Sequence, residues 1–149
     1  MNQDIRFCTT SDNVKLAYAV SGNGPPLVMP ATWLSHLEHQ WNSLAWQPWL
    51  ETLSQKYTLL RYDSRGCGLS DRNLTEFTFD GWIRDIEAVV DAAGCRKFDV
   101  LATCWGGAIG VEYAARHPDR GQRLILYGAY ALGRLRVEQP IGAETARLM

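Results

Sequence analysis

The stretch Leu101-Ala102-Thr103-Cys104-Trp105-Gly106-Gly107 decides the fold that this sequence predicts. A β-branched and apolar run over residues 98–103 leads into it, and residues 105–117 are typical of a helix that ends before Pro118. One Cys stands between the two elements, and two glycines follow it after one residue. The pattern predicts a strand, a sharp turn and a helix, with a nucleophilic side chain at the turn.

The residue types around this turn agree with its geometry. A strand that reverses abruptly into a helix strains the backbone of the turn residue and needs small neighbours, here Ala102, Gly106 and Gly107. The N-terminus of the helix offers free N–H groups and a positive partial charge, which favour a thiolate and an oxyanion. The usual pattern is G-x-S-x-G, and this chain has Ala-x-Cys-x-Gly, which retains the shape but not the serine chemistry. The alternative is a buried Cys in an ordinary strand-to-helix turn.

Apolar patterns in the rest of the chain predict an α/β fold. Strands are expected at residues 5–9, 14–20, 27–29, 57–62 and 124–127, and helices at residues 44–55, 79–93 and, as a short element, from Ala143. Thr78 is expected to cap the 79–93 helix and Gly94 to end it, whereas Pro48 either begins the 44–55 helix or kinks it. Residues 30–40 are expected to form a loop. An N-terminal hairpin followed by alternating strands and helices predicts a mostly parallel sheet with helices on both faces.

Composition excludes several classes of function. The chain has 149 residues, of which 46% are hydrophobic and 21% charged, and a net charge of −1, so neither a nucleic-acid nor a membrane partner is indicated. No apolar run is long enough to span a membrane, and the N-terminus lacks a signal-peptide pattern, so a cytoplasmic location is expected. The four cysteines form no C-x-x-C pair, so neither a zinc site nor a disulfide framework is indicated. We expect no metal and no cofactor.

Three segments, in the correct order, resemble the N-terminal half of an α/β-hydrolase-fold protein. Residues 27–32, Leu-Val-Met-Pro-Ala-Thr, are similar to the strand and loop that supply one oxyanion donor, with Pro-Ala in place of the usual His-Gly. Residues 63–71, Asp-Ser-Arg-Gly-Cys-Gly-Leu-Ser-Asp, are similar to the family's D-x-R-G-x-G-x-S turn, and residues 101–118 to its nucleophile elbow and following helix. The resemblance covers residues 5–130 and is greatest to hydrolase-like domains attached to bacterial adenylate cyclases and helix-turn-helix regulators, which often carry a Thr-Cys-x-Gly-Gly elbow.

The resemblance implies a single, incomplete α/β-hydrolase domain over residues 1–149, with the lid beginning near residue 133 and the C-terminal part of the fold missing. It implies Cys104 as the nucleophile, with the backbone N–H groups of Trp105 and of Thr32 or Trp33 as oxyanion donors. In this family the acid and the His of the triad follow the lid. The one His after Cys104 is His117, at the far end of the helix, and we interpret it as a solvent-exposed helix end. The triad is therefore expected to be incomplete.

Other residues are weaker candidates. Substrate-binding roles are assigned to Trp33, His36 and Trp41, although His36 and His39 also fit the description of surface-loop histidines. Trp41 and Trp105 could line a pocket for an apolar ligand. The polar pair Asp63 and Arg65 is interpreted as holding its turn together by hydrogen bonds, and the aromatic set Trp46, Trp49 and Trp82 as core packing.

Three hypotheses of function follow. The first is a hydrolase-type enzyme in which Cys104 attacks small esters, lactones or thioesters, with the acid and base expected from a missing C-terminal segment, from another chain or from a histidine such as His36. The second is a catalytically inactive hydrolase-like module that senses a small apolar ligand for a signalling protein. The third is a fragment of a longer gene product that folds by pairing, because the apolar strand at residues 124–127 would lie at an open sheet edge; a homo-oligomer is expected on this ground.

Overall fold

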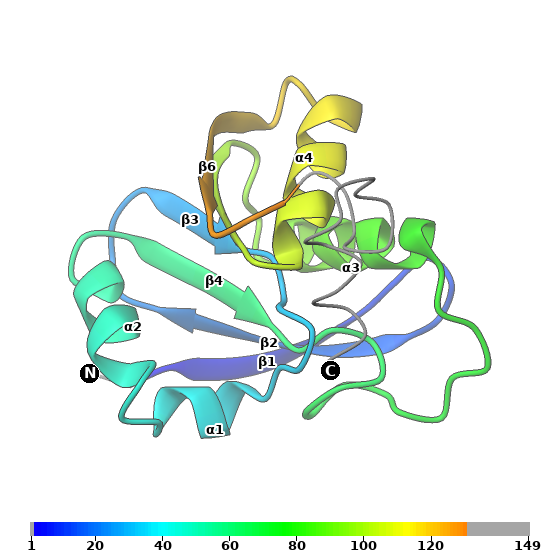
Figure 1. The fold of residues 1–149 in the computed structure, drawn as a ribbon, viewed down its shortest axis with the longest axis horizontal. Coiled ribbons are helices and arrows are strands. Elements are labelled where there is room, and N and C mark those ends of the chain that lie inside the picture. Colours follow the sequence, from blue (N-terminus) through cyan, green and yellow to red (C-terminus); the bar gives the residue numbers. More distant parts are fainter. Residues whose placement is uncertain (1, 131–149) are drawn as a thin grey trace, which may run out of the picture.

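The computed structural model describes residues 2–130 and confirms the α/β architecture (Figure 1). The expected lid from residue 133 and the short helix from Ala143 lie outside the described residues. The elements in chain order are β1 (Asp4–Thr9), β2 (Lys15–Ser21), β3 (Pro26–Met29), α1 (Leu37–Trp41), α2 (Gln47–Ser54), β4 (Thr58–Tyr62), α3 (Phe79–Ala92), β5 (Phe98–Thr103), α4 (Gly106–Arg116) and β6 (Gly121–Tyr127).

The described strands form one sheet in the order β1-β2-β4-β3-β5-β6. The hairpin strands β1 and β2 pair antiparallel, as does β2 with β4, and all pairs from β4 to β6 are parallel. The carboxyl ends of β3, β4, β5 and β6 therefore meet at one edge, where ligands bind in open α/β sheets. The mostly parallel sheet that the sequence predicts is confirmed.

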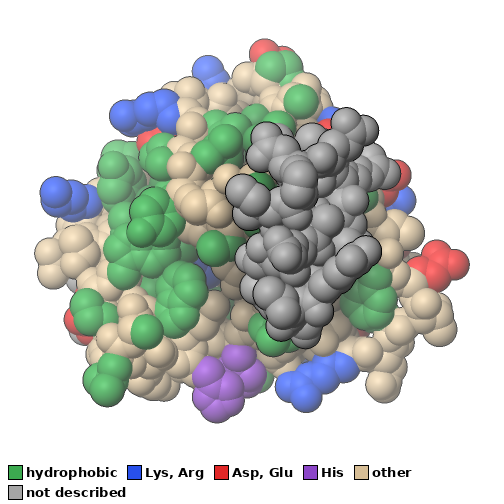
Figure 2. All heavy atoms as spheres, in the orientation of Figure 1, with side chains coloured by type: hydrophobic (Ala, Val, Ile, Leu, Met, Phe, Trp, Pro, Cys, Tyr) green, Lys and Arg blue, Asp and Glu red, His purple; other side chains and the backbone are tan. Residues whose placement is uncertain are grey.

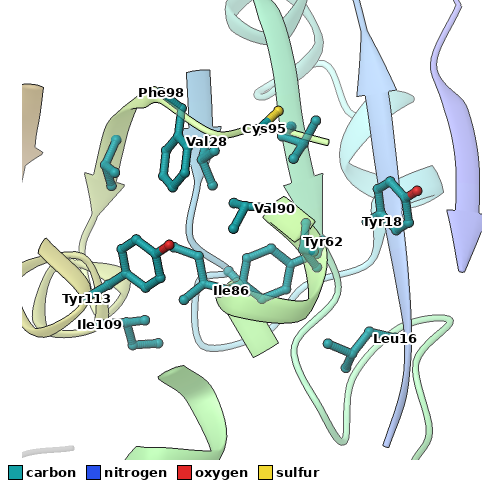
Figure 3. Close-up of a cluster of buried hydrophobic side chains, with 14 of the residues drawn as sticks. Leu16, Tyr18, Val28, Tyr62, Ile86, Val90, Cys95, Phe98, Ile109 and Tyr113 are labelled. Carbon is teal, nitrogen blue, oxygen red and sulfur yellow. The ribbon is translucent and has the colours of Figure 1, made fainter. Parts of the chain in front are cut away.

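Helices cover both faces of this sheet because its central strands are apolar on both sides. On one face, α3 and α4 enclose a core in which Ile86, Val90 and Tyr113 point toward the strand residues Val28 and Phe98 (Figure 3). On the other face, Leu50 of α2 packs with a separate cluster that contains Leu27, Met29, Leu59 and Leu101. Alternate residues of β3 and β5 thus enter different cores.

The helix boundaries show which local signals the sequence carries. The Thr78 hydroxyl accepts a hydrogen bond from the Gly81 amide at 3.0 Å, and Gly94 follows α3 with φ +69°, so both predicted ends are confirmed. The helix predicted at 44–55 instead begins at Gln47, with Pro48 in its first turn. Pro48 therefore lies at the start of the helix and does not kink it. The predicted 30–40 loop is wrong at its end, because residue 37 begins α1, a helix of five residues that is too short to show a helical period.

A buried cation organises the turn after β4. The Arg65 guanidinium donates hydrogen bonds to Asp85 of α3 at 2.9 Å and to Asp12 of the β1–β2 turn at 2.8 Å. Burial opposes the charge on Arg65, but hydrogen bonds to these two carboxylates outweigh it and raise its pKa above the ordinary value. The hydrogen bond from Arg65 likewise holds the pKa of Asp12 well below its usual range. Asp63 accepts hydrogen bonds from the amides of Leu69 and Leu37, so the predicted structural roles of Asp63 and Arg65 are confirmed.

Within residues 2–130, no helix combines the length and the apolar character that crossing a lipid bilayer requires.

Removing one partner of the buried ion pair is expected to destabilise the fold. Asp85→Ala leaves the Arg65 charge with Asp12 alone in a buried site, and we expect the free energy of unfolding to fall by about 3 kcal/mol or more. Asp91→Ala, on the same helix, is the matched control, because Asp91 pairs with Arg120 at an exposed position and its loss should cost less than about 1 kcal/mol. Urea unfolding of both variants measures the difference. Equal effects would contradict the role given to Arg65.

The homo-oligomer expected from the sequence has a defined test. Among the described strands β6 is an edge strand, and its residues 124–127 are apolar and exposed on both faces. Neither Pro nor Lys interrupts this strand, although such residues commonly protect edges. We expect light scattering at micromolar concentration to give a mass above that of one chain. Leu126→Glu should reduce that mass, whereas Phe7→Glu on the opposite edge strand should not; the two side chains are equally exposed, at 50% and 51%. A single-chain mass for the unmodified protein would refute this expectation.

Candidate active site

Cys104 lies at the apex of the turn between β5 and α4, with an exposed side chain and a φ of +48°. Positive φ is uncommon for a residue with a Cβ atom and costs on the order of 1–3 kcal/mol. The turn is held on both sides by the backbone, since the Cys104 amide donates to the Tyr127 carbonyl and the Gly107 amide donates to the Cys104 carbonyl, each at 3.1 Å. The strained elbow predicted from residues 101–107 is therefore present.

Close packing of α4 on the sheet explains the small residues around the elbow. A Cβ atom on Gly110 would lie 2.7 Å from the Cβ of Ala102, so the methyl group at residue 102 is accommodated by a glycine on the helix. A Cβ atom on Gly106 would lie 3.1 Å from the carbonyl oxygens of both Pro30 and Ala31. The loop after β3 thus touches the first turn of α4, which brings residue 32 to the neighbourhood of the elbow.

The two amides proposed as oxyanion donors are free of described partners. The N–H groups of Thr32 and Trp105 donate no hydrogen bond to any residue within 2–130. Trp105 directly precedes Gly106, the first residue of α4, so its amide stands at the positive end of that helix. These positions are compatible with an oxyanion hole formed by the β3 loop and the elbow.

The thiol of Cys104 opens into a cavity of about 750 Å³ over the ends of β5 and β6, which we call the strand cavity. Its other walls come from α2 and the residues before it, and Figure 2 shows hydrophobic side chains gathered on this face between α2 and β6. The Thr103 hydroxyl beside the cavity is buried and has no hydrogen-bond partner among the described residues. The strand cavity is lined by Ala45, Trp46, Trp49, Leu101, Thr103, Cys104, Ile125, Leu126 and Tyr127.

A second cavity of about 390 Å³, which we call the aromatic cavity, lies on the α3 side of the elbow. The rings of Trp82 and Trp105 meet edge to face in its wall, with their centres 4.4 Å apart. Trp105, which the sequence predicts to line a ligand pocket, and Trp33, a predicted substrate-binding residue, both line this cavity. The aromatic cavity is lined by Trp33, Leu34, Ser64, Arg65, Gly66, Cys67, Phe77, Trp82 and Trp105.

The remaining candidates lie elsewhere. Trp41 is buried in the core cluster of α2, with the Arg61 guanidinium 5.6 Å from its ring centre, and lines neither cavity. The tryptophans predicted as core, Trp46, Trp49 and Trp82, are half-buried: they pack against the cores with one side and line the cavities with the other. The sequence analysis did not name Tyr127 as a residue of the site. Its position at the end of an apolar strand, at the same sheet edge as Cys104, could have indicated it.

None of the chain's three histidines makes a hydrogen bond with Cys104, and the buried Nδ1 atom of His36 has no partner among the described residues. His36 and His39 stack with ring centres 4.0 Å apart at α1, and His117 makes a 2.8 Å contact with Glu87. His117 is thus half-buried and paired, rather than the solvent-exposed helix end that the sequence suggested. The Cys104 sulfur makes no hydrogen bond with a described residue, and residues 2–130 contain no cluster of ligands for a metal ion.

Comparisons with known proteins agree with this geometry. The family model described as alpha/beta hydrolase fold matches residues 25–145. A cis-3-alkyl-4-alkyloxetan-2-one decarboxylase of Shewanella oneidensis is 33% identical over 124 residues, which cover 79% of this chain and 37% of that protein. A hydrolase from Pseudomonas aeruginosa superposes with a TM-score of 0.76 at 27% identity, covering 97% of this chain and 58% of the other. An esterase from Rhodococcus gives a TM-score of 0.72 at 30% identity, covering 87% and 48%. The chain therefore spans 37–58% of the length of these relatives.

The packing of α4 on β5 makes a prediction for two small residues. Gly110→Ala is expected to lower the free energy of unfolding by about 1–3 kcal/mol, because its methyl group would overlap that of Ala102. Adding Ala102→Gly removes the overlap, and the double variant should regain at least half of the loss. Gly121→Ala is the control, because a Cβ atom there meets nothing within 4 Å. Thermal unfolding of the unmodified protein, of both single variants and of the double variant measures the coupling, and additive effects would contradict the proposed contact.

Proposed function

The chain belongs to the alpha/beta hydrolase fold family, and from that premise we propose that Cys104 accepts the acyl group of a small carboxylic ester, lactone or thioester. The observation that carries the proposal is the exposed thiol at a positive-φ elbow, opening into a cavity beside the amide of Trp105. The names of two relatives concern compounds of this class: the Shewanella protein is a decarboxylase of an oxetan-2-one, which is a four-membered lactone, and the Rhodococcus protein is an esterase.

The proposed step uses groups present at the elbow. The sulfur of Cys104 attacks the carbonyl carbon and forms a C–S bond, while the amides of Trp105 and Thr32 donate hydrogen bonds to the negative oxygen. The C–O or C–S bond of the substrate then breaks, and the alcohol or thiol leaves with the electron pair and takes a proton from solvent; in a lactone it stays attached to the acyl chain. The thiol proton passes to solvent. Water must next cleave the thioester to release the acid and restore the thiol, and a base beside the sulfur is needed to speed this second step.

A reaction with 4-nitrophenyl butyrate tests the proposal. We expect a burst of one 4-nitrophenolate per chain and one butyryl group on Cys104, located by peptide mass spectrometry. Because no described group is placed as a base, turnover after the burst should be slower by on the order of a hundredfold or more. Burial raises the pKa of Cys8 to about 11 and that of Cys95 above its ordinary value, so these thiols should not react.

Two variants complete this test. Cys104→Ala should abolish the burst, whereas Cys67→Ala should retain it, since Cys67 is half-buried and its sulfur lies 3.7 Å from the carbonyl oxygen of Trp33. Butyryl groups spread equally over Cys67 and Cys104 would reject the elbow as the site of acyl transfer.

The placement of the histidines favours a second candidate function. Because none of the three histidines is hydrogen-bonded to Cys104, and His117 is instead paired with Glu87, the elbow also suits a ligand-sensing module without catalysis, like the hydrolase-like domains of signalling proteins. In that case no butyryl group should form on Cys104, and ligand binding should survive Cys104→Ala.

A further inference from the structure

Arg61 of β4 is a buried cation that has no carboxylate partner within residues 2–130. It is only 5% exposed, and its guanidinium donates hydrogen bonds to the side-chain oxygens of Gln40, at 3.2 Å, and Gln3, at 2.6 Å. The amide nitrogen of Gln3 donates to the Leu37 carbonyl at 3.2 Å, so its oxygen is directed toward Arg61. Both acceptors are neutral, whereas the equally buried Arg65 is paired with two carboxylates. Direct contacts therefore leave the charge of Arg61 uncompensated.

Burial makes this charge costly. Burial lowers the pKa of Arg61 to about 10, although the negative charge of Asp63 raises it, so the guanidinium still carries its charge at neutral pH. Asp63 forms no ion pair with Arg61, and its carboxylate instead accepts hydrogen bonds from the amides of Leu37 and Leu69. Buried charges in proteins are normally paired, because an unpaired charge retains the full cost of its desolvation. The described residues supply no such partner, so this position requires a counter-ion from solution.

A cavity beside Arg61, which we call the Arg61 cavity, has room for one small particle. It lies between β4 and the helices α1 and α2 (Figure 1), and its volume of about 20 Å³ accommodates about one water-sized sphere. None of its lining residues is acidic, and Arg61 is the one lining residue that carries a charge. The size of the cavity excludes carboxylate ligands and phosphate, and its charge favours an anion.

Three side chains at the Arg61 cavity have hydrogen-bond donors to spare. The glutamines take two of the five N–H groups of Arg61, and the other three have no acceptor within residues 2–130. The Ser35 oxygen accepts from the Ser64 amide at 3.1 Å, which leaves the hydroxyl proton available. The oxygen of Gln40 is occupied by Arg61, so its NH₂ group is the free end. A water molecule can accept these hydrogen bonds but cannot compensate the charge, whereas a monatomic anion does both.

We propose that the Arg61 cavity binds one small monovalent anion, chloride or another halide, held by the Arg61 guanidinium with Ser35 and Gln40 as further donors. Residues of the loop after β3, among them Thr32, line the same cavity, so the bound ion joins this loop to β4 and stabilises the folded state. The site is separate from the elbow, and the inference does not depend on the proposed function of Cys104.

Urea unfolding at constant ionic strength and constant protein concentration tests the proposal. Sodium chloride is exchanged for sodium gluconate, whose anion is too large for the Arg61 cavity. An ion that binds only the folded state raises the folding equilibrium constant, and we expect a rise on the order of tenfold between about 5 mM and about 150 mM chloride. Equal stability in the two salts would overturn the proposal.

Two arginine variants locate the effect. Arg61→Met removes the charge but keeps a long side chain against Trp41, and we expect it to fold and to have the same stability in chloride and gluconate. Arg116→Met is the control, because Arg116 is 42% exposed and pairs with Asp80 and Glu112, and it should keep the full chloride dependence. An undiminished chloride dependence in Arg61→Met would place the ion elsewhere and overturn the proposal.

A crystal structure of the unmodified protein decides the case in which Arg61→Met does not fold. Bromide replaces chloride at the highest concentration of the series, because its anomalous scattering distinguishes it from water. We expect bromide within hydrogen-bond distance of the Arg61 guanidinium. Water at this position overturns the proposal. Bromide at Arg61 in a protein whose stability chloride does not raise also overturns it, since that result describes an adventitious ion only.

Discussion

The close approach of α4 to β5 is the constraint on which the candidate site depends. Only two residues separate β5 from α4, which packs back on that strand and leaves no room for side chains at the contact. For this reason Gly110 lies opposite Ala102 and Gly106 against the β3 loop. The same reversal requires a positive φ at residue 104, a strain that the surrounding packing must maintain. The result is a thiol held out from the sheet edge at a helix N-terminus. The hydrogen bond from the Cys104 amide to Tyr127 makes β6 part of this support, and the same strand forms a wall of the strand cavity.

The Arg65 network shapes the aromatic cavity, on the α3 side of the elbow. Two charges taken out of water are costly, and their attraction repays that cost only where the hydrogen bonds are complete, as they are between Arg65, Asp85 and Asp12. This network joins three segments far apart in the sequence: the β1–β2 turn, the turn after β4 and the middle of α3. Fixing α3 in this way places Trp82 against Trp105, so a structural ion pair determines the shape of the cavity beside the elbow.

Short stretches of sequence were sufficient to predict much of the fold and the residue at the centre of the candidate site. The elbow at Cys104, the Thr78 cap and the hairpin are each specified within a few residues, and the sequence predicted them. The strand cavity could not be predicted in this way, because it joins Trp46 and Trp49 to Tyr127 through the strand order β4-β3-β5-β6. Helical periodicity shows that a tryptophan lies on the apolar face of a helix. It does not distinguish a ring packed in a core from a ring that lines a cavity, because both recur at the same spacing along the sequence. The helix α1 was missed for a different reason, since five residues contain little more than one turn.

Acyl transfer through an elbow divides into two steps with different requirements. Attack by the thiol needs an exposed sulfur, oxyanion donors and a site for the acyl group, and the described residues offer candidates for all three. Release of the acyl group needs a base at the sulfur, and none of the three histidines is hydrogen-bonded to Cys104. A site that performs the first step without the second retains its acyl group as a thioester. The same elbow therefore serves an enzyme when a base reaches the sulfur and a covalent receptor when none does, so the lifetime of the thioester, rather than the fold, separates the two functions.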